Sequence, residues 1–286
     1  MAGFRTATRE QSRLRMTIDG PAGSGKTFTA LRFAHALGGR IALLDTERGS
    51  ASKYAGEAPD GIPWAFDVAE LTRFSPEDYT RTIELAGKSG YNVLIIDSLS
   101  HAWEGQGGAL ELKQKAGDSW SAWRNITPIH NRMVDAVLQS PCHIITTMRS
   151  RMEYVQEADD RGRVTIRKVG LSPIQRPGME YEFDIVCDMD YQHILSVSKS
   201  RCSAVADLRI ERPGPEFMTP VIEWLSVVRP APIAFHVAPT EHDDEKVTLE
   251  MLVERFGAEA VMNASGGTIP DTDIEVAMIG AILESA

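Results

Sequence analysis

The sequence predicts an α/β fold: a mostly parallel central sheet with helices on both faces, followed by a small helical region at the C-terminus. Apolar runs of strand length alternate with stretches of helical periodicity through the first half of the chain. These runs are apolar at consecutive positions, which is typical of parallel strands that helices bury on both sides. A proline-rich stretch near residue 230 then separates this part from a tail with helical patterns only.

The first half of the chain supplies the core of the predicted sheet. We expect strands at 14–18, 40–45, 91–97 and 142–147. We expect helices at 27–38, 75–90 and 120–139. The second of these helices has clear boundary signals, because Ser75 can cap its N-terminus, Pro76 suits its first position and Gly90 can end it.

The second half has a different pattern. Two short strand-like stretches, 152–157 and 163–170, flank a polar segment and predict a β-hairpin or a mobile loop. Two further strands are expected at 182–190 and 193–199. The sequence therefore predicts a core domain at 1–228, a linker at 229–245 and a small acidic helical region at 246–286.

The composition is that of an ordinary soluble globular protein. Of the 286 residues, 43% are hydrophobic and 24% are charged. No apolar run approaches the ~18 residues of a membrane span, and the N-terminal stretch lacks the apolar core of a signal peptide. We therefore expect a cytoplasmic protein that does not act in a membrane. The three scattered cysteines are expected to be buried thiols.

The net charge of −10 is unevenly distributed along the chain. Residues 231–286 hold 11 acids and two bases, whereas residues 1–230 hold 29 acids and 28 bases. The near-neutral core leaves room for a local basic patch, so the overall negative charge does not exclude nucleic-acid binding. An acidic tail usually keeps a protein soluble, and it can also recruit a basic partner.

A phosphate-binding loop lies between the first strand and the first helix. Residues 20–27 fit the pattern G-x-x-x-x-G-K-[ST], and they have the strand-to-helix context that this motif requires. Its glycines let backbone N–H groups turn toward phosphates, and the helix N-terminus adds partial positive charge. The residues of this loop are Gly20, Pro21, Ala22, Gly23, Ser24, Gly25, Lys26 and Thr27. Lys26 is expected at the β and γ phosphates of ATP, and Thr27 is expected to bind Mg²⁺.

Two carboxylates follow strands that can reach this loop. Asp97 ends an apolar strand, and a carboxylate at this position can hold Mg²⁺ in the Walker B role. Asp45 and Glu47 end the strand that follows the first helix. That strand can lie beside the P-loop strand or beyond the Asp97 strand, and only some of these layouts let a carboxylate at its end face the γ-phosphate. The alternative is a pair of solvated acids at a strand end.

From residue 14 to about residue 210 the sequence resembles the RecA-like recombinase ATPases. The resemblance rests on the P-loop, D-T-E at 45–47, D-S-L-S-H at 97–101 and a segment from Gly117 to Arg149. It implies a RecA-like P-loop NTPase fold, with Glu47 as the base that activates water. It also implies that Tyr54 stacks on adenine, because a tyrosine with that role lies nine positions after the aspartate in bacterial RecA. Asp45 is expected to supply a supporting hydrogen bond.

The resemblance extends to residues that sense or complete the ATP site. The family places a glutamine that senses the γ-phosphate at the position of Thr147, so the shorter threonine is a departure from the pattern. Lys199 and Arg201 resemble a basic pair that reaches the ATP of a neighbouring subunit, which implies a homo-oligomer, either a filament or a ring. The alternative for this pair is a solvated basic strand end.

Two segments occupy the positions of the family's DNA-binding loops, about 104–118 and about 150–175. The second segment holds a group of basic residues that could follow a phosphate backbone, and the alternative is a β-hairpin with balanced surface charge. These residues are Arg151, Arg161, Arg163, Arg167 and Lys168. Trp103, Trp120 and Trp123 flank the first segment, where core packing is the expectation and base stacking the alternative.

The chain has only about 13 residues before its first strand, unlike the larger recombinases, and resembles compact bacteriophage ATPases, the Sak group of single-strand annealing proteins. The stretches D-T-E-R-G, D-S-L-S-H and T-T-M-R-S-R carry this resemblance. Membership would imply ATP-dependent binding of single-stranded DNA and pairing of complementary strands, in the cytoplasm of a bacterial host. The acidic tail could then bind a single-strand-binding protein or another partner. A different hypothesis is a P-loop ATPase that acts as a switch or loader on a protein partner, in helicase loading or DNA packaging. A metabolite kinase is a third.

Overall fold

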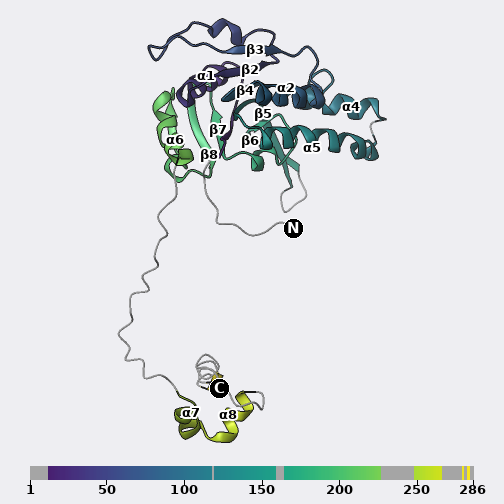
Figure 1. Ribbon diagram of the computed structural model, residues 1–286. Helices are drawn as coiled ribbons and strands as arrows, with labels where there is room; N and C mark the ends of the chain where they lie inside the picture. The colour runs from purple at the N-terminus through teal and green to yellow at the C-terminus, as the bar shows by residue number, and fades with distance from the viewer. Residues whose placement is uncertain are drawn as a thin grey trace. The chain divides into compact units, whose positions relative to one another are not determined.

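The computed structural model describes residues 12–117, 119–158, 164–226 and 248–265, together with residues 279, 282 and 283. Between residues 153 and 170 it describes the backbone only. The chain divides into two compact units, Met1–Pro230 and Ala231–Ala286. Figure 1 shows the sheet and its covering helices in the first unit, and the helices labelled α7 and α8 in the second.

The first unit is built on one nine-stranded sheet. Its strands lie in the order β3-β2-β4-β5-β1-β7-β8-β9, and β6 pairs only with β5. The strands β1 to β5 and β7 are parallel to their neighbours in this order, whereas β8 and β9 are antiparallel. The strands are β1 (Arg15–Gly20), β2 (Ile41–Asp45), β3 (Asp67–Glu70), β4 (Val93–Asp97), β5 (His143–Ala158), β6 (Val164–Pro173), β7 (Ile185–Met189), β8 (Ile194–Ser200) and β9 (Arg209–Glu211). The sequence-based expectation of a mostly parallel α/β fold is confirmed.

Helices cover both faces of this sheet. In Figure 1, α1 and α6 lie on one side, and α2, α4 and α5 lie on the other. The helices of the first unit are α1 (Lys26–Leu37), α2 (Pro76–Lys88), α3 (His101–Glu104), α4 (Ala109–Lys115), α5 (Trp123–Gln139) and α6 (Met218–Ser226). Short 3-10 helices occur at η1 (Ala51–Tyr54), η2 (Trp120–Ala122), η3 (Met179–Glu182), η4 (Ser203–Val205) and η5 (Pro215–Phe217).

The apolar strands fill two cores, one on each face of the sheet. Side chains alternate between faces along a strand, so Leu43 of β2 packs into the core under α1, and its neighbour Leu44 packs into the core under α2 and α5. Both side chains are fully buried. This two-sided burial explains why the strands have no polar face in the sequence. Cys142, Cys187 and Cys202 are buried free thiols, as expected.

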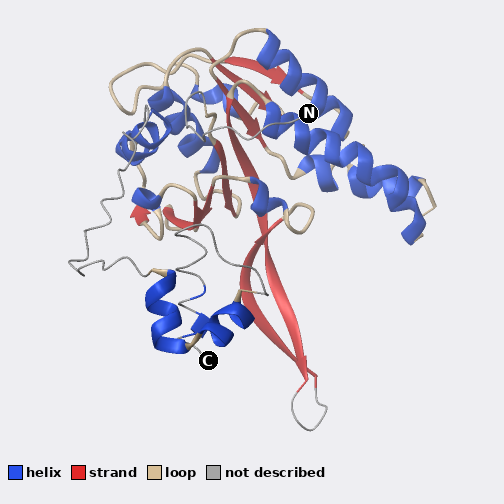
Figure 2. Ribbon diagram, turned by 60° about the horizontal axis from the view of Figure 1, so that its bottom comes forward, coloured by secondary structure: helices blue, strands red, loops and turns tan. Residues whose placement is uncertain are grey.

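The strand β5 is longer than the sequence indicated. The expected strands at 142–147 and 152–157 are parts of one strand of 16 residues, His143–Ala158. Its first part lies inside the sheet, and its second part pairs with β6 in an antiparallel two-stranded arm. Figure 2 shows this arm as a pair of strands that extends away from the sheet. We refer to residues 150–173 as the arm.

Two other elements differ from the expectation. The segment at about 104–118, expected at the position of a DNA-binding loop, holds the helix α4, and a tight turn over residues 105–108 joins it to α3. The edge strand β3 was not expected, because all four of its residues are exposed and it lacks the apolar run that marked the other strands. Ser75 caps α2 as expected and accepts a hydrogen bond from the Asp78 N–H.

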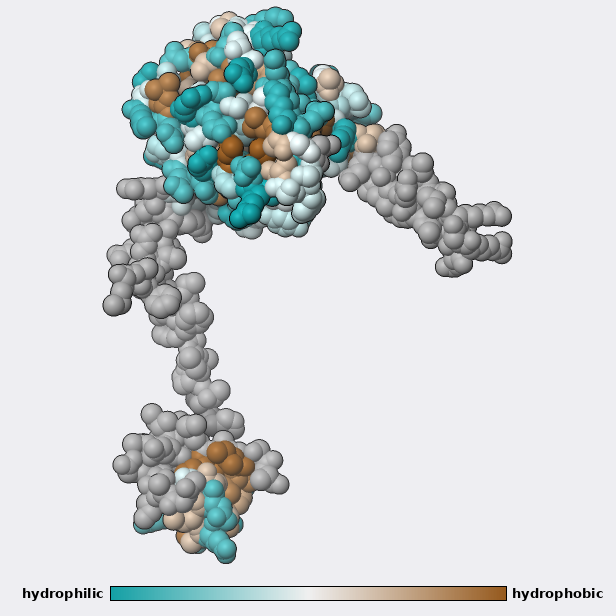
Figure 3. All heavy atoms as spheres, turned by 90° about the vertical axis from the view of Figure 1, so that its right-hand side faces the viewer, coloured by the Kyte–Doolittle hydropathy of each residue, from teal (hydrophilic) through white to brown (hydrophobic). Residues whose placement is uncertain are grey.

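The second unit contains α7 (Leu249–Phe256) and α8 (Ala258–Ala264), which pack around Leu252 and Val261. Thr248 caps α7, and its hydroxyl accepts a hydrogen bond from the Met251 N–H at 3.3 Å. Figure 3 shows hydrophobic residues at the surface of this unit, and small hydrophobic groups among hydrophilic ones on the face of the first unit. Among the described helices none is long and apolar enough to cross a membrane.

Candidate nucleotide site

The loop between β1 and α1 has the backbone of a phosphate-binding loop. Gly23 and Gly25 have φ angles of 80° and 96°, a left-handed conformation that other residues rarely adopt. The helix α1 then begins at Lys26, so its free N–H groups face the inside of the turn. The Lys26 ammonium donates a hydrogen bond to the Pro21 carbonyl at 2.8 Å, and burial lowers its pKa. The loop is therefore preformed around its own lysine.

Asp97 lies beside this loop at the end of β4. Its Oδ2 accepts a hydrogen bond from the Thr27 hydroxyl at 2.6 Å, and its Oδ1 accepts one from the Thr147 hydroxyl at 2.5 Å. Burial raises the pKa of Asp97, and these two hydrogen bonds act in the opposite direction. The structure thus brings together Thr27 and Asp97, the two residues predicted to bind Mg²⁺, and it places Thr147 on the carboxylate rather than at an open position.

The order of the strands decides between the two layouts considered for Glu47. The strand β2 pairs with β4, and β5 lies between β4 and the P-loop strand β1. Asp45 at the end of β2 is the direct neighbour of Asp97 in this pairing. The strand that leads to Glu47 therefore lies beyond the Asp97 strand, and Glu47 is close enough to Lys26 to act on it electrostatically.

The turn after β2 orients Glu47. The Asp45 carboxylate accepts hydrogen bonds from the N–H groups of Glu47 at 2.5 Å and of Ala51 at 3.4 Å, which is the supporting role expected for it. Arg48 has a φ of 57° and Gly49 a φ of 77°, so the chain turns sharply just after the glutamate. This turn directs the Glu47 side chain back toward β5.

Glu47 meets Arg149 in a bidentate ion pair. The Arg149 Nη2 donates to Glu47 Oε2 at 2.6 Å and to Oε1 at 2.8 Å, and Nε donates to Oε1 at 3.0 Å. Both carboxylate oxygens therefore accept hydrogen bonds from Arg149. The pair is partly exposed, with 42% of the Arg149 side chain and 27% of the Glu47 side chain accessible. Next to Glu47, the buried Thr46 hydroxyl lies 2.7 Å from His101 Nδ1, which links the turn after β2 to α3.

An open cavity beside the P-loop can hold the rest of a nucleotide. It has a volume of about 440 Å³ and is lined by Gly23 and Gly25 of the loop, by Phe28 and by Tyr54, among other residues. Tyr54 is half-buried at the end of η1, and its ring meets the Phe28 ring edge-on at 5.8 Å between centroids. The residue predicted as an adenine platform therefore lies in the cavity that adjoins the phosphate loop.

The basic pair at the end of β8 lies far from this site in the fold. Because β8 is antiparallel to β7, the last residues of β8 lie beside the first residues of β7, at the ends of the strands that point away from the P-loop. Lys199 donates hydrogen bonds to the carbonyls of Glu180, Tyr181 and Phe183 at 2.8–3.0 Å. Arg201 is more exposed and pairs with Asp184 at 2.8 Å. Neither side chain can reach the ATP site of its own subunit.

Three of the five predicted DNA-binding residues lie on the described strands of the arm. Arg151 is exposed on β5, at the point where β5 leaves the sheet. Arg167 and Lys168 lie on β6, opposite Val155 and Tyr154 in the backbone pairing. Arg161 and Arg163 lie outside the described residues.

The three tryptophans near the first predicted DNA segment behave differently from one another. Trp103 and Trp123 stack with 5.4 Å between centroids, in agreement with packing. Trp120 has 87% of its surface exposed, so the expectation of core packing is wrong for this residue. It is the first residue of η2, between α4 and α5, and the buried residue of this short helix is Ala122 rather than the tryptophan.

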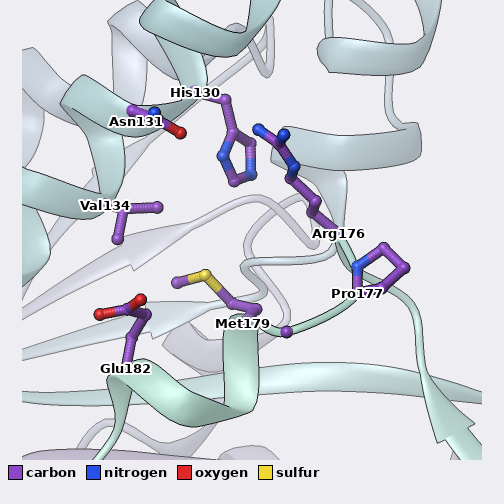
Figure 4. A pocket seen from close by; sticks show the side chains of 8 residues that line it. His130, Asn131, Val134, Arg176, Pro177, Met179 and Glu182 are labelled. Atoms are coloured by element: carbon purple, nitrogen blue, oxygen red, sulfur yellow. The ribbon is translucent and has the colours of Figure 1, made fainter.

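A second cavity lies near the base of the arm and is separate from the nucleotide site. It has a volume of about 160 Å³, and Figure 4 shows His130 and Arg176 close together on one side and Glu182 on the other. His130 Nε2 lies 3.3 Å from Gln175 Oε1, and Gln175 Nε2 donates to the Leu99 carbonyl at 2.9 Å. Helix α5 is thereby linked to the segment that follows Asp97.

Arg149 and His193 are among the residues of the nucleotide site that were not predicted. Arg149 follows Thr147 by two positions on one strand, so both side chains lie on the same face, and this periodicity could have identified it. His193 lines the nucleotide cavity, and its Nδ1 lies 3.0 Å from the Ser24 carbonyl. No pattern in the sequence marks His193, because it comes from a turn more than 160 residues beyond the P-loop.

Comparisons with known proteins agree with this geometry. A family model described as an AAA domain matches residues 12–207, which is well over half of the chain. The match covers the P-loop, Asp97, Glu47 and the whole arm. The comparison with curated proteins gives no match.

Proposed function

The chain belongs to this AAA-domain family of P-loop ATPases, and from that premise we propose that it binds single-stranded DNA and pairs complementary strands in a cycle driven by ATP. The observation that carries the proposal is the continuity of β5. One strand runs from Thr147 at the ATP site into an arm whose sequence holds a group of basic residues. A residue of the ATP site and the proposed DNA-binding element thus belong to the same strand.

The residues at the P-loop support hydrolysis as the reaction. Lys26 and the loop N–H groups bind the phosphates. Glu47 accepts a proton from a water molecule while the oxygen of that water bonds to the γ-phosphorus. The bond from that phosphorus to the β–γ bridging oxygen breaks, and ADP and phosphate leave. The side chains fit Mg²⁺, because the oxygens of Thr27 and Asp97 lie 2.6 Å apart and Mg²⁺ takes one or two protein oxygens beside phosphates. When bound, the ion would neutralise charge on the transferring phosphoryl group.

Binding of DNA along the arm would be tolerant of sequence. Basic side chains contact phosphates whatever the base, so affinity would fall steeply with salt. The exposed ring of Trp120 offers a flat surface on which a base can stack. The stretches D-T-E-R, D-S-L-S-H and T-T-M-R-S-R, which resemble phage annealing ATPases, point to the same substrate.

The proposal also includes assembly of several copies. Arg201 lies at the ends of the strands that point away from the P-loop, so it can complete only the ATP site of another copy. Lys199 is a weaker candidate, because three backbone carbonyls hold its ammonium. A head-to-tail contact of this kind produces a ring or a filament.

The experiment that tests the proposal measures ATP hydrolysis with and without single-stranded DNA, together with annealing of labelled complementary strands. We expect DNA to stimulate hydrolysis and ATP to stimulate annealing. Glu47→Gln should keep ATP binding and lower hydrolysis by roughly 10²-fold or more, the scale of a general base. Hydrolysis that DNA does not change, with no annealing, would refute the DNA-pairing proposal and leave the ATPase intact.

A second candidate function is a switch or loader that acts on a protein partner. The observation that favours it is the C-terminal unit, a separate acidic body whose helices expose Met251 and Met262 to about 40%. Deletion of residues 231–286 separates the two candidates. If the tail is the docking module of a loader, its deletion abolishes the action on the partner, whereas DNA annealing by residues 1–230 should persist.

A further inference from the structure

We propose that Arg149 detects the terminal phosphate of the nucleotide by exchanging Glu47 for that phosphate, so that Glu47 becomes free only when a triphosphate is bound. This inference deepens the proposed function and rests on Glu47 as the base of the ATPase cycle. It assigns Arg149 as a binding residue for the γ-phosphate. It also assigns the observed ion pair to the resting state of the enzyme.

The first step of the reasoning is that the ion pair with Arg149 makes Glu47 a weaker base in the observed state. A carboxylate accepts a proton from water through a free oxygen lone pair within hydrogen-bond reach of that water. Here Arg149 engages Oε1 twice and Oε2 once, at 2.6–3.0 Å. The planar fork of the guanidinium matches the carboxylate and holds it by charge-assisted hydrogen bonds. Departure of the guanidinium would therefore free the lone pairs it occupies and make Glu47 a stronger base toward water.

The second step is that Arg149 lies where a γ-phosphate can attract it. In the pairing of β1 with β5, Arg149 is the direct neighbour of Gly20, the first residue of the phosphate loop. Arg149 and Glu47 both act electrostatically on Lys26, the residue predicted to bind the γ-phosphate. A triphosphate brings negative charge to this point, whereas a diphosphate leaves it empty. The two nucleotides therefore offer Arg149 different partners.

The third step is that the exchange needs only side-chain motion. The backbone of Arg149 is held on both sides: its N–H donates to the Ser100 hydroxyl at 2.9 Å, and its carbonyl accepts from the Ile174 N–H at 2.7 Å. Its side chain is 42% exposed and can rotate without repacking a core. Thr147, the expected sensor, is already bonded to Asp97. The longer Arg149, two positions along the same face, is the side chain free to respond.

The experiment measures the dissociation constants of fluorescent ADP and of a fluorescent non-hydrolysable ATP analogue, both with Mg²⁺. Arg149→Met should weaken binding of the ATP analogue about tenfold and change ADP binding less than about twofold. This magnitude lies between that of an exposed ion pair and that of a buried charge-assisted contact. Glu47→Gln should tighten the ATP analogue several-fold, because Arg149 then has no competing partner. The control is Arg81→Met, which removes an exposed arginine on α2.

The double variant Arg149→Met, Glu47→Gln distinguishes partner exchange from simple charge repulsion. If Arg149 exchanges partners, the tightening caused by Glu47→Gln disappears in the Arg149→Met background. Equal tightening in both backgrounds, or equal weakening of ADP and the ATP analogue by Arg149→Met, overturns the proposal. If Arg149→Met fails to fold, Arg149→Lys replaces it in the test. This variant keeps the charge, so the ratio of the dissociation constants of the ATP analogue and ADP should lie between those of the natural chain and of Arg149→Met. These constants need no DNA, so failure of the DNA-pairing proposal would leave them unchanged.

Discussion

The carboxyl of Asp19 should make the first unit less stable as pH rises from about 4 to about 8. Asp19 lies in β1 just before the phosphate loop, with 1% of its surface exposed. Burial raises its pKa from 3.8 to about 8, and the neighbouring Asp188 on β7 adds to this shift. A hydrogen bond from the Thr17 hydroxyl at 3.0 Å opposes it only in part. Asp19 therefore keeps its proton in the folded protein at neutral pH.

The sign of the effect follows from proton binding in the two states. Between pH 4 and pH 8 the folded protein holds a proton at Asp19 that the unfolded chain has released. Rising pH therefore favours the unfolded chain. Each unit of pKa difference corresponds to about 1.4 kcal/mol, so the full shift corresponds to about 6 kcal/mol. Between pH 5 and pH 8 the loss should be on the order of 4 kcal/mol.

The change that tests this is Asp19→Asn, which keeps the shape and the acceptor for Thr17 and removes the titration. Urea unfolding at pH 5 and pH 8 gives the free energy of unfolding of both proteins. All five tryptophans lie between Trp64 and Trp224, so their fluorescence follows the first unit alone. Other titrating groups contribute equally to both proteins and cancel in the comparison. The variant should gain stability over the natural chain as pH rises.

The refuting result is an equal dependence on pH in the two proteins. Asp188→Asn provides a graded control, because Asp188 is exposed and raises the pKa of Asp19 only as a secondary cause. It should flatten the dependence on pH less than Asp19→Asn does. An effect of Asp188→Asn as large as that of Asp19→Asn would mean that charge repulsion, rather than burial, controls this carboxyl.

Four further predictions concern binding and assembly. Lys26→Ala should remove nucleotide binding, measured with fluorescent ATP, because it deletes the cation of the phosphate loop; unchanged affinity would contradict this. Tyr54→Ala should weaken ADP and ATP equally, by about 1–3 kcal/mol if the ring stacks on the base. The Arg201→Ala variant by itself should not hydrolyse ATP, and a mixture with Lys26→Ala should recover part of the activity. In the mixture, the Lys26→Ala subunit supplies Arg201 to a neighbour whose phosphate loop is intact; no recovery would argue against action between subunits. Trp120→Ala should lower affinity for single-stranded DNA by about 1–3 kcal/mol, measured by fluorescence anisotropy.

The parts of the site that the sequence predicted are those with local signals. The phosphate loop is one continuous stretch, and the fold type follows from apolar runs that alternate with helical patterns. Asp97 could be named because it ends a strand, and the ends of parallel strands meet on one side of the sheet. The role of Glu47 was implied by the resemblance to the RecA-like ATPases, because the residues alone left a pair of solvated acids as the alternative. The order of the strands, which decides what Glu47 faces, left no trace in the sequence.

The parts that were missed depend on pairing between distant segments. Arg149 lies 102 residues from Glu47, and only the register of β5 between β1 and β4 brings the two together. The continuity of β5 was missed because the polar residues Arg149, Ser150 and Arg151 separate its two predicted parts in the sequence. The position of His193 depends on a turn between two antiparallel strands, and its role is visible only in three dimensions.

The two-stranded arm has a consequence for engineering. Its pairing continues from Ser150 opposite Pro173 to Ala158 opposite Val164, with one irregularity at Glu153. An antiparallel ladder keeps its register when one residue is removed from each strand at matched positions, and two such pairs also restore which side chains share a face. Each pair removed shortens the ladder by about 3.4 Å. The length of the arm can therefore be varied, which changes the distance between the ATP site and the pair Ala158–Val164 while the catalytic residues stay unchanged.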